Sequence, residues 1–186
     1  TAVKLAFKKI EQNAIISSWK DAYSSSGNQG NISDHIQVPT FGCYIDKRER
    51  TFKNKQKCIE KIWSIGGTTG WYYGDWLWKL RGFMDKLAGG VGLRRGRTNL
   101  NSINVGDALD FWRVIYADKK EGRLLLHAEM KLPGEAWLEF KVVSNELLQT
   151  ATFRPLGVLG RMYWFAVLPF HGAIFNGMLK KLTSSQ

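Results

Sequence analysis

The glycine-rich segment GGVGLRRGR at residues 89–97 joins a pliable backbone to three cationic side chains, a combination that can hold an anion. Its spacing differs from the dinucleotide-binding motif GxGxxG because the third glycine comes one residue late, and the sequence contains no GK[ST] phosphate-binding loop. Two interpretations stay open. The glycines end a helix and lead into a strand, or backbone amides bind a phosphate or carboxylate together with Arg94, Arg95 and Arg97.

The three histidines, His35, His127 and His171, have no second metal-ligating residue at i+3 or i+4, so we expect no metal site. His171 shares a helix face with Trp164 and other apolar residues. It is either a core histidine bonded to a carbonyl that Pro169 loosens, or a ligand-contacting or acid–base group inside a cavity.

The two cysteines, Cys43 and Cys58, lack CxxC spacing and a neighbouring histidine cluster, so we expect free thiols rather than a zinc site. The sequence has no GxSxG motif and no base close to either cysteine, which leaves a hydrolase triad without support. Free thiols fit a reducing compartment, and the chain does not open like a signal peptide. The sequence therefore predicts a cytoplasmic protein.

The segment GDALDFWRV at residues 106–114 reads as a strand with Arg113 on one face and Trp112 on the other. A partly buried charge needs a partner, and Glu129 and Glu139 lie on neighbouring predicted strands. Arg113 is therefore expected either to form an ion pair across the outer face of the sheet or to anchor the polar end of a ligand.

Basic residues outnumber acidic ones by 27 to 16, and the resulting net charge of +11 favours anionic partners. The basic residues are spread along the chain, however, which is typical of a solvated surface. Aromatic residues beside basic ones at residues 71–81 could stack on nucleic-acid bases. Their helical spacing indicates a core or cavity wall instead, so nucleic acid is disfavoured as a partner.

The start of the chain differs in composition from the rest. Residues 3–23 read as a helix with a poor apolar stripe, and the polar stretch 24–31 reads as a linker. We therefore expect residues 1–31 to be the tail of a preceding domain and residues 32–186 to form one domain. That domain begins with a strand within residues 35–41 that ends at Pro39, and a second extended piece at 42–46 is followed by a basic loop.

Two helices are predicted next. The first covers residues 55–65, and the second follows the loop 66–70, with Thr68 or Thr69 as its cap. Two i,i+4 pairs of opposite charge, Asp75–Lys79 and Arg81–Asp85, would support the second helix. Its apolar stripe recurs every three or four residues at Tyr72, Trp76, Leu80, Phe83 and Leu87.

The later part of the chain predicts a sheet closed by a helix. Alternating runs joined by short turns indicate antiparallel strands at 105–117, 123–132, 135–143 and 147–155. Residues 158–182 are apolar almost all round, which predicts a helix surrounded on all sides. Charged and polar interruptions favour burial over a membrane span. The fold class is therefore α+β, a helix-grip arrangement in which a curved antiparallel sheet wraps around a long C-terminal helix and leaves a cavity.

Four segments carry a family resemblance: IGGTTGWYYGDWLWKLRGFMDKLAGGVGLRRGR (65–97), GDALDFWRV (106–114), LLLHAEMKLPGEAWLEF (124–140) and ATFRPLGVLGRMYWFAVLPFHGAIF (151–175). Over residues 36–180 the chain resembles a bacterial domain family of unknown function. That family is usually found C-terminal to NAD(P)-binding Rossmann domains of the atypical short-chain dehydrogenase, NmrA-like type. It is grouped with the START and polyketide-cyclase-like (SRPBCC) helix-grip superfamily.

The resemblance implies that residues 3–23 continue a preceding Rossmann protein. Because the Rossmann glycine motif is absent from this chain, we expect no cofactor here, and NAD(P) only in a fused N-terminal domain. Helix-grip relatives bind lipids, polyketides or other hydrophobic molecules, and a few are cyclases or hydrolases. The resemblance supplies no catalytic residue set.

Three functions remain open. The first is a binding module that holds an apolar or amphipathic small molecule, in the full-length protein beside a Rossmann domain. The second is a cyclase or isomerase that uses His171 and a carboxylate, and the third is a ligand-free module for homodimerisation or docking. The candidate cavity residues are Arg113, Trp112, Trp137, Tyr163, Trp164 and His171.

Overall fold

The computed structural model describes residues 38–87 and 102–184, which all belong to one compact unit, residues 36–186. The predicted helix and linker at residues 1–31 lie outside the described residues, and so do Arg94, Arg95 and Arg97. The side chains of Lys79 and Asp85 are likewise not described. The anion site and the two helical ion pairs therefore stay predictions.

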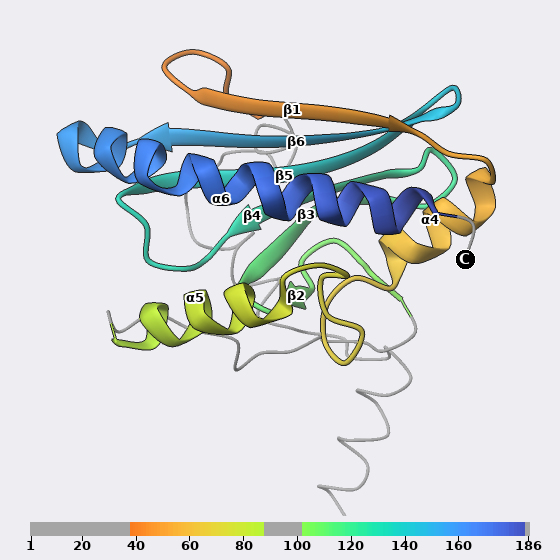
Figure 1. The fold of residues 1–186 in the computed structure, drawn as a ribbon, viewed down its shortest axis with the longest axis horizontal. Helices are drawn as coiled ribbons and strands as arrows, with labels where there is room; N and C mark the ends of the chain where they lie inside the picture. The colour runs from red at the N-terminus through yellow and green to blue at the C-terminus, as the bar shows by residue number, and fades with distance from the viewer. Residues whose placement is uncertain (1–37, 88–101, 185–186) are drawn as a thin grey trace, which may run out of the picture. The chain divides into compact units, whose positions relative to one another are not determined.

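The described residues form one six-stranded antiparallel sheet in the order β1-β6-β5-β4-β3-β2 (Figure 1). The strands are β1 (Tyr44–Thr51), β2 (Ala108–Leu109), β3 (Trp112–Asp118), β4 (Arg123–Ala128), β5 (Gly134–Val143) and β6 (Glu146–Pro155). The helices are α4 (Lys55–Trp63), α5 (Asp75–Leu87) and α6 (Gly157–Thr183). The predicted α+β helix-grip class, a curved antiparallel sheet with one long C-terminal helix, is confirmed.

Short turns set the order of the central strands. In the β3–β4 turn the Asp118 carboxylate accepts hydrogen bonds from the backbone N–H groups of Lys120 and Glu121, at 2.8 and 2.9 Å. Gly122 completes this turn at a φ of 74°, where glycine is favoured over residues with a Cβ. Because such turns make consecutive strands antiparallel neighbours, β3 to β6 line up in sequence, and β1 pairs with the free side of β6.

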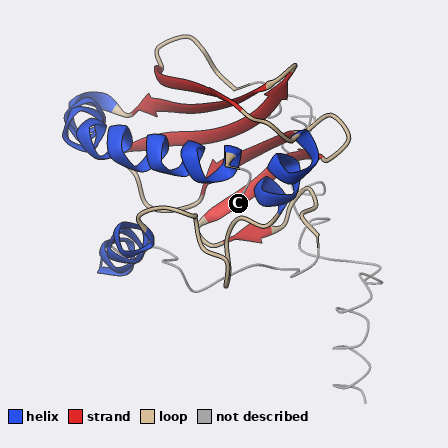
Figure 2. Ribbon diagram, turned by 45° about the vertical axis from the view of Figure 1, so that its right-hand side comes forward, coloured by secondary structure: helices blue, strands red, loops and turns tan. Residues whose placement is uncertain are grey.

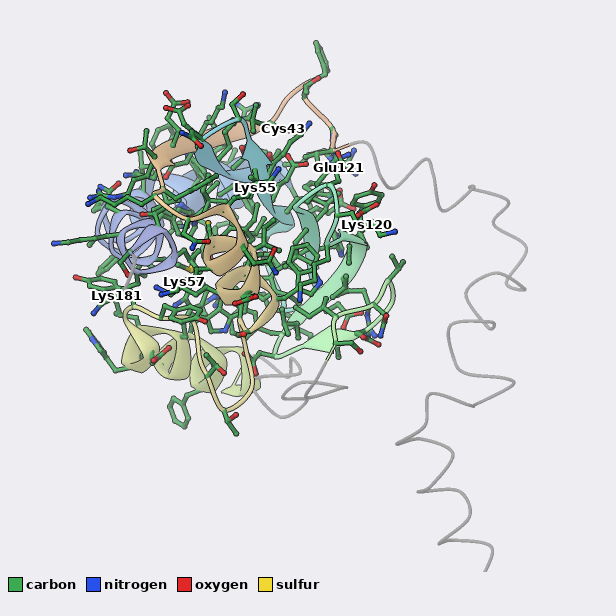
Figure 3. All side chains as sticks on the ribbon, turned by 90° about the vertical axis from the view of Figure 1, so that its right-hand side faces the viewer. Cys43, Lys55, Lys57, Lys120, Glu121 and Lys181 are labelled. Carbon is green, nitrogen blue, oxygen red and sulfur yellow. The ribbon has the colours of Figure 1, made fainter. Side chains whose placement is uncertain are left out.

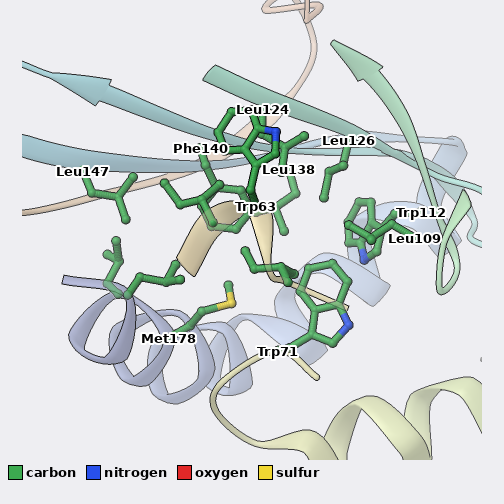
Figure 4. Close-up of a cluster of buried hydrophobic side chains, with 14 of the residues drawn as sticks. Trp63, Trp71, Leu109, Trp112, Leu124, Leu126, Leu138, Phe140, Leu147 and Met178 are labelled. Atoms are coloured by element: carbon green, nitrogen blue, oxygen red, sulfur yellow. The ribbon is translucent and has the colours of Figure 1, made fainter. Parts of the chain in front are cut away.

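The core lies on one face of this sheet (Figure 4). Alternation along β4, β5 and β6 turns Leu126, Leu138, Phe140 and Leu147 to that face, where all four are fully buried. Met178 of α6 is equally buried in the same cluster. Burying a side chain of this size contributes about 1.5–3 kcal/mol, so this layer supplies much of the stability of the domain.

The C-terminal half of α6 is fixed to α4 as well as to the sheet. Both helices lie on the same face of the sheet (Figure 2). The Lys61 ammonium of α4 donates hydrogen bonds to the carbonyls of Lys181 and Ser184, at 2.9 and 2.7 Å. Carbonyls at the end of a helix lack donors within the helix, so Lys61 caps α6 and holds its end in place.

The prediction that the C-terminal helix is surrounded on all sides is wrong for its N-terminal half. The helix lies along one face of the sheet, so its opposite side there remains uncovered. By length and composition α6 could also cross a membrane, a criterion that the core helices of soluble proteins meet too. Between 60% and 76% of the surface is exposed for Leu156, Val158, Leu159, Met162 and Phe165.

The basic segment after Asp46 is a strand rather than the predicted loop. It continues β1 to Thr51 and pairs with β6 along its whole length. Charged residues are well tolerated here because an edge strand keeps many of its side chains in water. The same strand turns Tyr44, Asp46 and Arg48 toward the α6 side of the sheet.

Helix α5 starts later than predicted and presents a different face. It begins at Asp75, and Tyr72 lies in the preceding loop at a φ of 64°. Trp76 and Phe83 of the predicted packed stripe are exposed, whereas Leu77 and Trp78 pack against the core. Periodicity identified residues that share a face, but the core packs against the neighbouring face of this helix.

Gly177 of α6 lies directly against the ring of Tyr73 in the loop that leads into α5. A Cβ atom at Gly177 would overlap that ring. Gly172, in the same helix, has open space where its Cβ would be. The missing side chain of Gly177 therefore lets the start of α5 approach α6.

The two glycines make a matched pair of substitutions. Gly172→Ala is expected to raise the free energy of unfolding by about 0.5–1 kcal/mol, because alanine is the better helix former. Gly177→Ala should lower it despite the same gain in propensity, since Tyr73 must move. Urea unfolding followed by circular dichroism measures both. Equal stabilisation by the two variants would contradict the packing of Tyr73 on α6.

Candidate functional site

A cavity of about 470 Å³ lies between the inner face of the sheet, α5 and α6. This volume is within the range of small-molecule sites, roughly 300–1,000 Å³. Nearly all of its lining side chains are apolar or aromatic. They include Trp112, Leu138, Ala151 and Phe153 from the sheet, Tyr163, Trp164, Val167, His171, Ile174 and Phe175 from α6, and Leu77, Trp78, Leu80 and Arg81 from α5.

The cavity opens to solvent between the two helices. Leu80 of α5 and Phe170 of α6 both line it, yet 47% and 56% of their surfaces are exposed. Residues that touch the cavity and water at once mark its mouth. A ligand can therefore enter between α5 and α6 without separating the strands.

Stacked rings build the wall formed by α6. Trp164 lies nearly parallel to Tyr44 of β1 and to Phe153 of β6, with ring centroids 5.6 and 5.8 Å apart. Tyr163 lies 5.6 Å from Phe153, and burial raises the pKa of its phenol, which therefore stays protonated at neutral pH. These contacts hold the aromatic wall in one arrangement.

His171 faces the same cavity from two helical turns further along α6. Its ring lies 5.3 Å from Trp164 and 4.7 Å from Phe175, and its Nδ1 atom has no hydrogen-bond partner. Burial lowers the pKa of His171; the Asp46 carboxylate opposes this effect, and Arg48 adds to it. The imidazole is therefore neutral at neutral pH.

The structure thus places five of the six predicted cavity residues in the lining of one cavity: Trp112, Trp137, Tyr163, Trp164 and His171. The sixth, Arg113, has its side chain on the opposite face of the sheet. Arg113 makes a bidentate ion pair with Glu129, at 2.7 and 2.8 Å, and donates to the carbonyl of Gly106. It is therefore held by protein groups and does not anchor a ligand in this cavity.

Trp137 belongs to the cavity lining, but its ring is directed away from the cavity. Strand alternation turns Leu138 inward and Trp137 outward, where its ring packs 5.3 Å from His127. Its aromatic character suggested a ligand contact, but the register of β5 decides its face.

Arg81 is the charged residue of the lining, and the sequence did not assign it to the cavity. It lies in α5, and its guanidinium carbon is 5.7 Å from the centre of the Tyr163 ring. The available signal was a cation placed three and four residues after Trp78 and Leu77, which puts it on the same helix face as two core residues.

Asp110 is a buried acidic residue outside the cavity lining, and it has a structural role. It adopts a φ of 55°, and its carboxylate accepts a hydrogen bond of 2.8 Å from the indole N–H of Trp71. Burial raises its pKa, and the bond from Trp71 works against that rise. Its oxygen holds Trp71 beside Phe111 and Trp112 in the core.

The lysines and cysteines that the structure describes outside the cavity are distributed over several elements. Exposed lysines project from separate elements, with Lys55 and Lys57 on α4, Lys120 in the β3–β4 turn and Lys181 on α6 (Figure 3). The prediction of two free thiols is confirmed, and burial raises the pKa of Cys58 to about 11. Within residues 38–87 and 102–184, no group of His, Cys, Asp or Glu could hold a metal ion.

The lowered pKa of His171 predicts a pH dependence of stability. Above about pH 6.5 the histidine is neutral in both folded and unfolded chains. Below that value the unfolded chain takes up a proton first, so wild-type stability falls. His171→Gln removes this contribution, so the stability of the wild type relative to the variant should decrease from pH 7.5 to pH 5.5. Urea unfolding at pH 7.5 and at pH 5.5 measures the difference in free energy of unfolding between the two proteins. A difference that does not change with pH would contradict the buried neutral imidazole.

Comparison with known proteins places the chain in a family. No curated protein matches it. Among solved structures, that of Ara h 8.0201 is similar at 11% sequence identity and a TM-score of 0.39, over 76% of this chain and 98% of that one. The family model described as Protein of unknown function (DUF2867) matches residues 42–178, which include every described strand and most of α6. The chain therefore belongs to the DUF2867 family.

Proposed function

We propose that this domain binds an apolar or amphipathic small molecule in the cavity between the sheet, α5 and α6. The observation that carries the proposal is the cavity itself, with about 470 Å³ of space, aromatic walls and an open mouth. Protein interiors are close-packed, and an apolar void lowers stability. A large void that also reaches solvent is best explained by a ligand that fills it.

The walls indicate how such a ligand would be held. The rings of Trp112, Trp164 and Phe175 are buried and immobilised by their neighbours, so they offer contact area without further ordering. Each Å² of apolar ligand surface removed from water would contribute about 25 cal/mol. Shape and apolar contact would therefore supply most of the affinity.

The place of this domain in a longer protein is part of the proposal. Its resemblance to domains found after NAD(P)-binding Rossmann domains supports a role in presenting or shielding a substrate for redox chemistry elsewhere. The absence of the GxGxxG motif from this sequence supports placing NAD(P) in that other domain. A cytoplasmic location is consistent with this role and with NAD(P) binding in the other domain.

A cyclase or isomerase is less well supported by the same cavity. Such an enzyme would need a carboxylate within reach of the atoms that His171 contacts. None of the described lining residues is an aspartate or glutamate. The carboxylate that acts on His171, that of Asp46, is paired with Arg48 at 3.0 Å.

The proposal is tested with N-phenyl-1-naphthylamine, an uncharged probe whose fluorescence rises in apolar sites. Ala166 lines the cavity from an exposed position on α6, so Ala166→Trp should occupy its mouth with little effect on folding. Ala173 is an exposed alanine of the same helix outside the lining, and Ala173→Trp is the matched control. We expect saturable binding near one equivalent, weakened at least tenfold by Ala166→Trp and unchanged by Ala173→Trp.

Two results would argue against cavity binding. The first is no saturable binding to the wild type. The second is an equal loss for both tryptophan variants, which would place the probe elsewhere on the surface. Circular dichroism of each variant verifies that the fold is retained.

Self-association is a second candidate function, favoured by the exposed apolar half of α6. Monomeric proteins rarely expose a continuous apolar surface, and such surfaces usually mark interaction sites. Met162 and Phe165 lie in that half and are more than half exposed. A second copy of the chain would bury them across a symmetric contact.

Sedimentation velocity tests this candidate directly. The wild type should form dimers at about 100 μM, and the double substitution Met162→Glu, Phe165→Glu should convert them to monomers, because buried carboxylates are costly. A wild type that stays monomeric over the same concentration range would exclude the homodimer.

A further inference from the structure

Three of the four described residues with unpartnered buried polar atoms line the cavity. They are Arg81 through Nη2, Trp112 through Nε1 and His171 through Nδ1. The fourth, Gln149, is fully buried in β6 but is not part of the lining. A buried polar atom without a partner is unfavourable and rare in folded proteins. Its repeated occurrence around one cavity indicates that the ligand supplies the partner.

The chemistry of these atoms defines what that partner must be. The Arg81 guanidinium and the Trp112 indole N–H can only donate hydrogen bonds. Arginine also stays charged at all accessible pH values. Because His171 is neutral, Arg81 carries the only fixed charge among the described side chains of the lining. The missing partner is therefore an acceptor, and a negative charge would complement it.

The protein itself compensates Arg81 only in part. Among the side chains that the structure describes, which do not include the predicted partner Asp85, no carboxylate forms an ion pair with Arg81. The Tyr163 ring, 5.7 Å away, offers a cation–π contact, which is a weaker interaction than an ion pair with bidentate hydrogen bonds. By contrast, Arg48, Arg113, Arg123 and Arg154 each have a carboxylate partner.

The position of Arg81 also suggests how a ligand would be oriented. Arg81 is adjacent to Leu80, which lies at the mouth between α5 and α6. Leu138, Ala151 and Ile174 line the cavity with apolar groups and are buried away from solvent. A charged group at Arg81 would leave an apolar tail in contact with these residues.

We infer that the cavity selects amphipathic anions, in which a carboxylate or similar head group binds Arg81 and an apolar body fills the space beneath α6. This inference rests on the proposed function, because it specifies the ligand class of the same cavity. Trp112 is buried, with 6% of its surface exposed, and its N–H is a second donor for an acceptor atom further inside. Selectivity for the charge resides in Arg81.

Octanoate and 1-octanol test the inference, since they share one alkyl chain and differ in head-group charge. Isothermal titration calorimetry at pH 7.5 compares the full chain with Arg81→Gln, which keeps a polar side chain of similar length. Arg161→Gln is the matched control, because Arg161 is an exposed arginine of α6 outside the lining. We expect the wild type to bind octanoate at least tenfold more tightly than octanol. Arg81→Gln should abolish that preference by weakening octanoate alone, and Arg161→Gln should preserve it.

The other outcomes separate the inference from the proposed function. Equal affinity for octanoate and octanol in the wild type would overturn the inference and leave cavity binding intact. An equal loss of affinity for octanoate and octanol in Arg81→Gln would likewise overturn the inference, because it would show that Arg81 shapes the cavity wall and does not bind the charged head group. Failure of both probes to bind the wild type would overturn the inference together with the proposed function. Thermal unfolding of Arg81→Gln checks that the variant is folded.

Discussion

The attachment of the C-terminal half of α6 to the sheet is the interaction on which the rest of the domain depends. Met178, Leu179 and Leu182 are buried there, and Lys61 caps the helix end. The preceding stretch of α6, from Tyr163 to Phe175, instead borders the cavity. One helix therefore has two roles, with the core at its C-terminal end and the cavity wall toward its N-terminal end.

Helix α5 completes the cavity through a contact that only glycine permits. Gly177 leaves room for Tyr73, and the loop that contains Tyr73 delivers Leu77, Trp78 and Arg81 to the cavity. This arrangement explains why a cation faces aromatic walls. Arg81 is placed by its helix, and the space in front of it is set by the sheet and α6. The mouth lies between these two helices, so small movements of α5 would change access to the cavity.

Much of the fold follows from the sequence because alternation and turn chemistry are local. The strands from Trp112 to Pro155 and the long helix after them were predicted for that reason, and so was the α+β class. Local sequence patterns do not show which distant segments contact one another. Trp137 lines the cavity as predicted, but the register of β5 turns its ring outward, and α5 packs through a different face from its apolar stripe.

The site was only partly predictable for the same reason. Tyr163, Trp164 and His171 share a helix face, so the sequence placed them together correctly, whereas Arg81 joins them across the fold. An arginine in a helix is ordinarily assigned to the solvent side. Only the arrangement of α5 against α6 shows that its Nη2 atom is buried without a partner.

We propose that the cavity, and not the exposed half of α6, holds the ligand. Intermolecular nuclear Overhauser effects between bound octanoate and the protein measure this directly. Contacts from the alkyl chain to Leu138, Ile174 and Phe175 are the result that a cavity ligand predicts. Contacts confined to Val158, Leu159 and Met162 would place the ligand on the outer surface of α6 and contradict binding in the cavity.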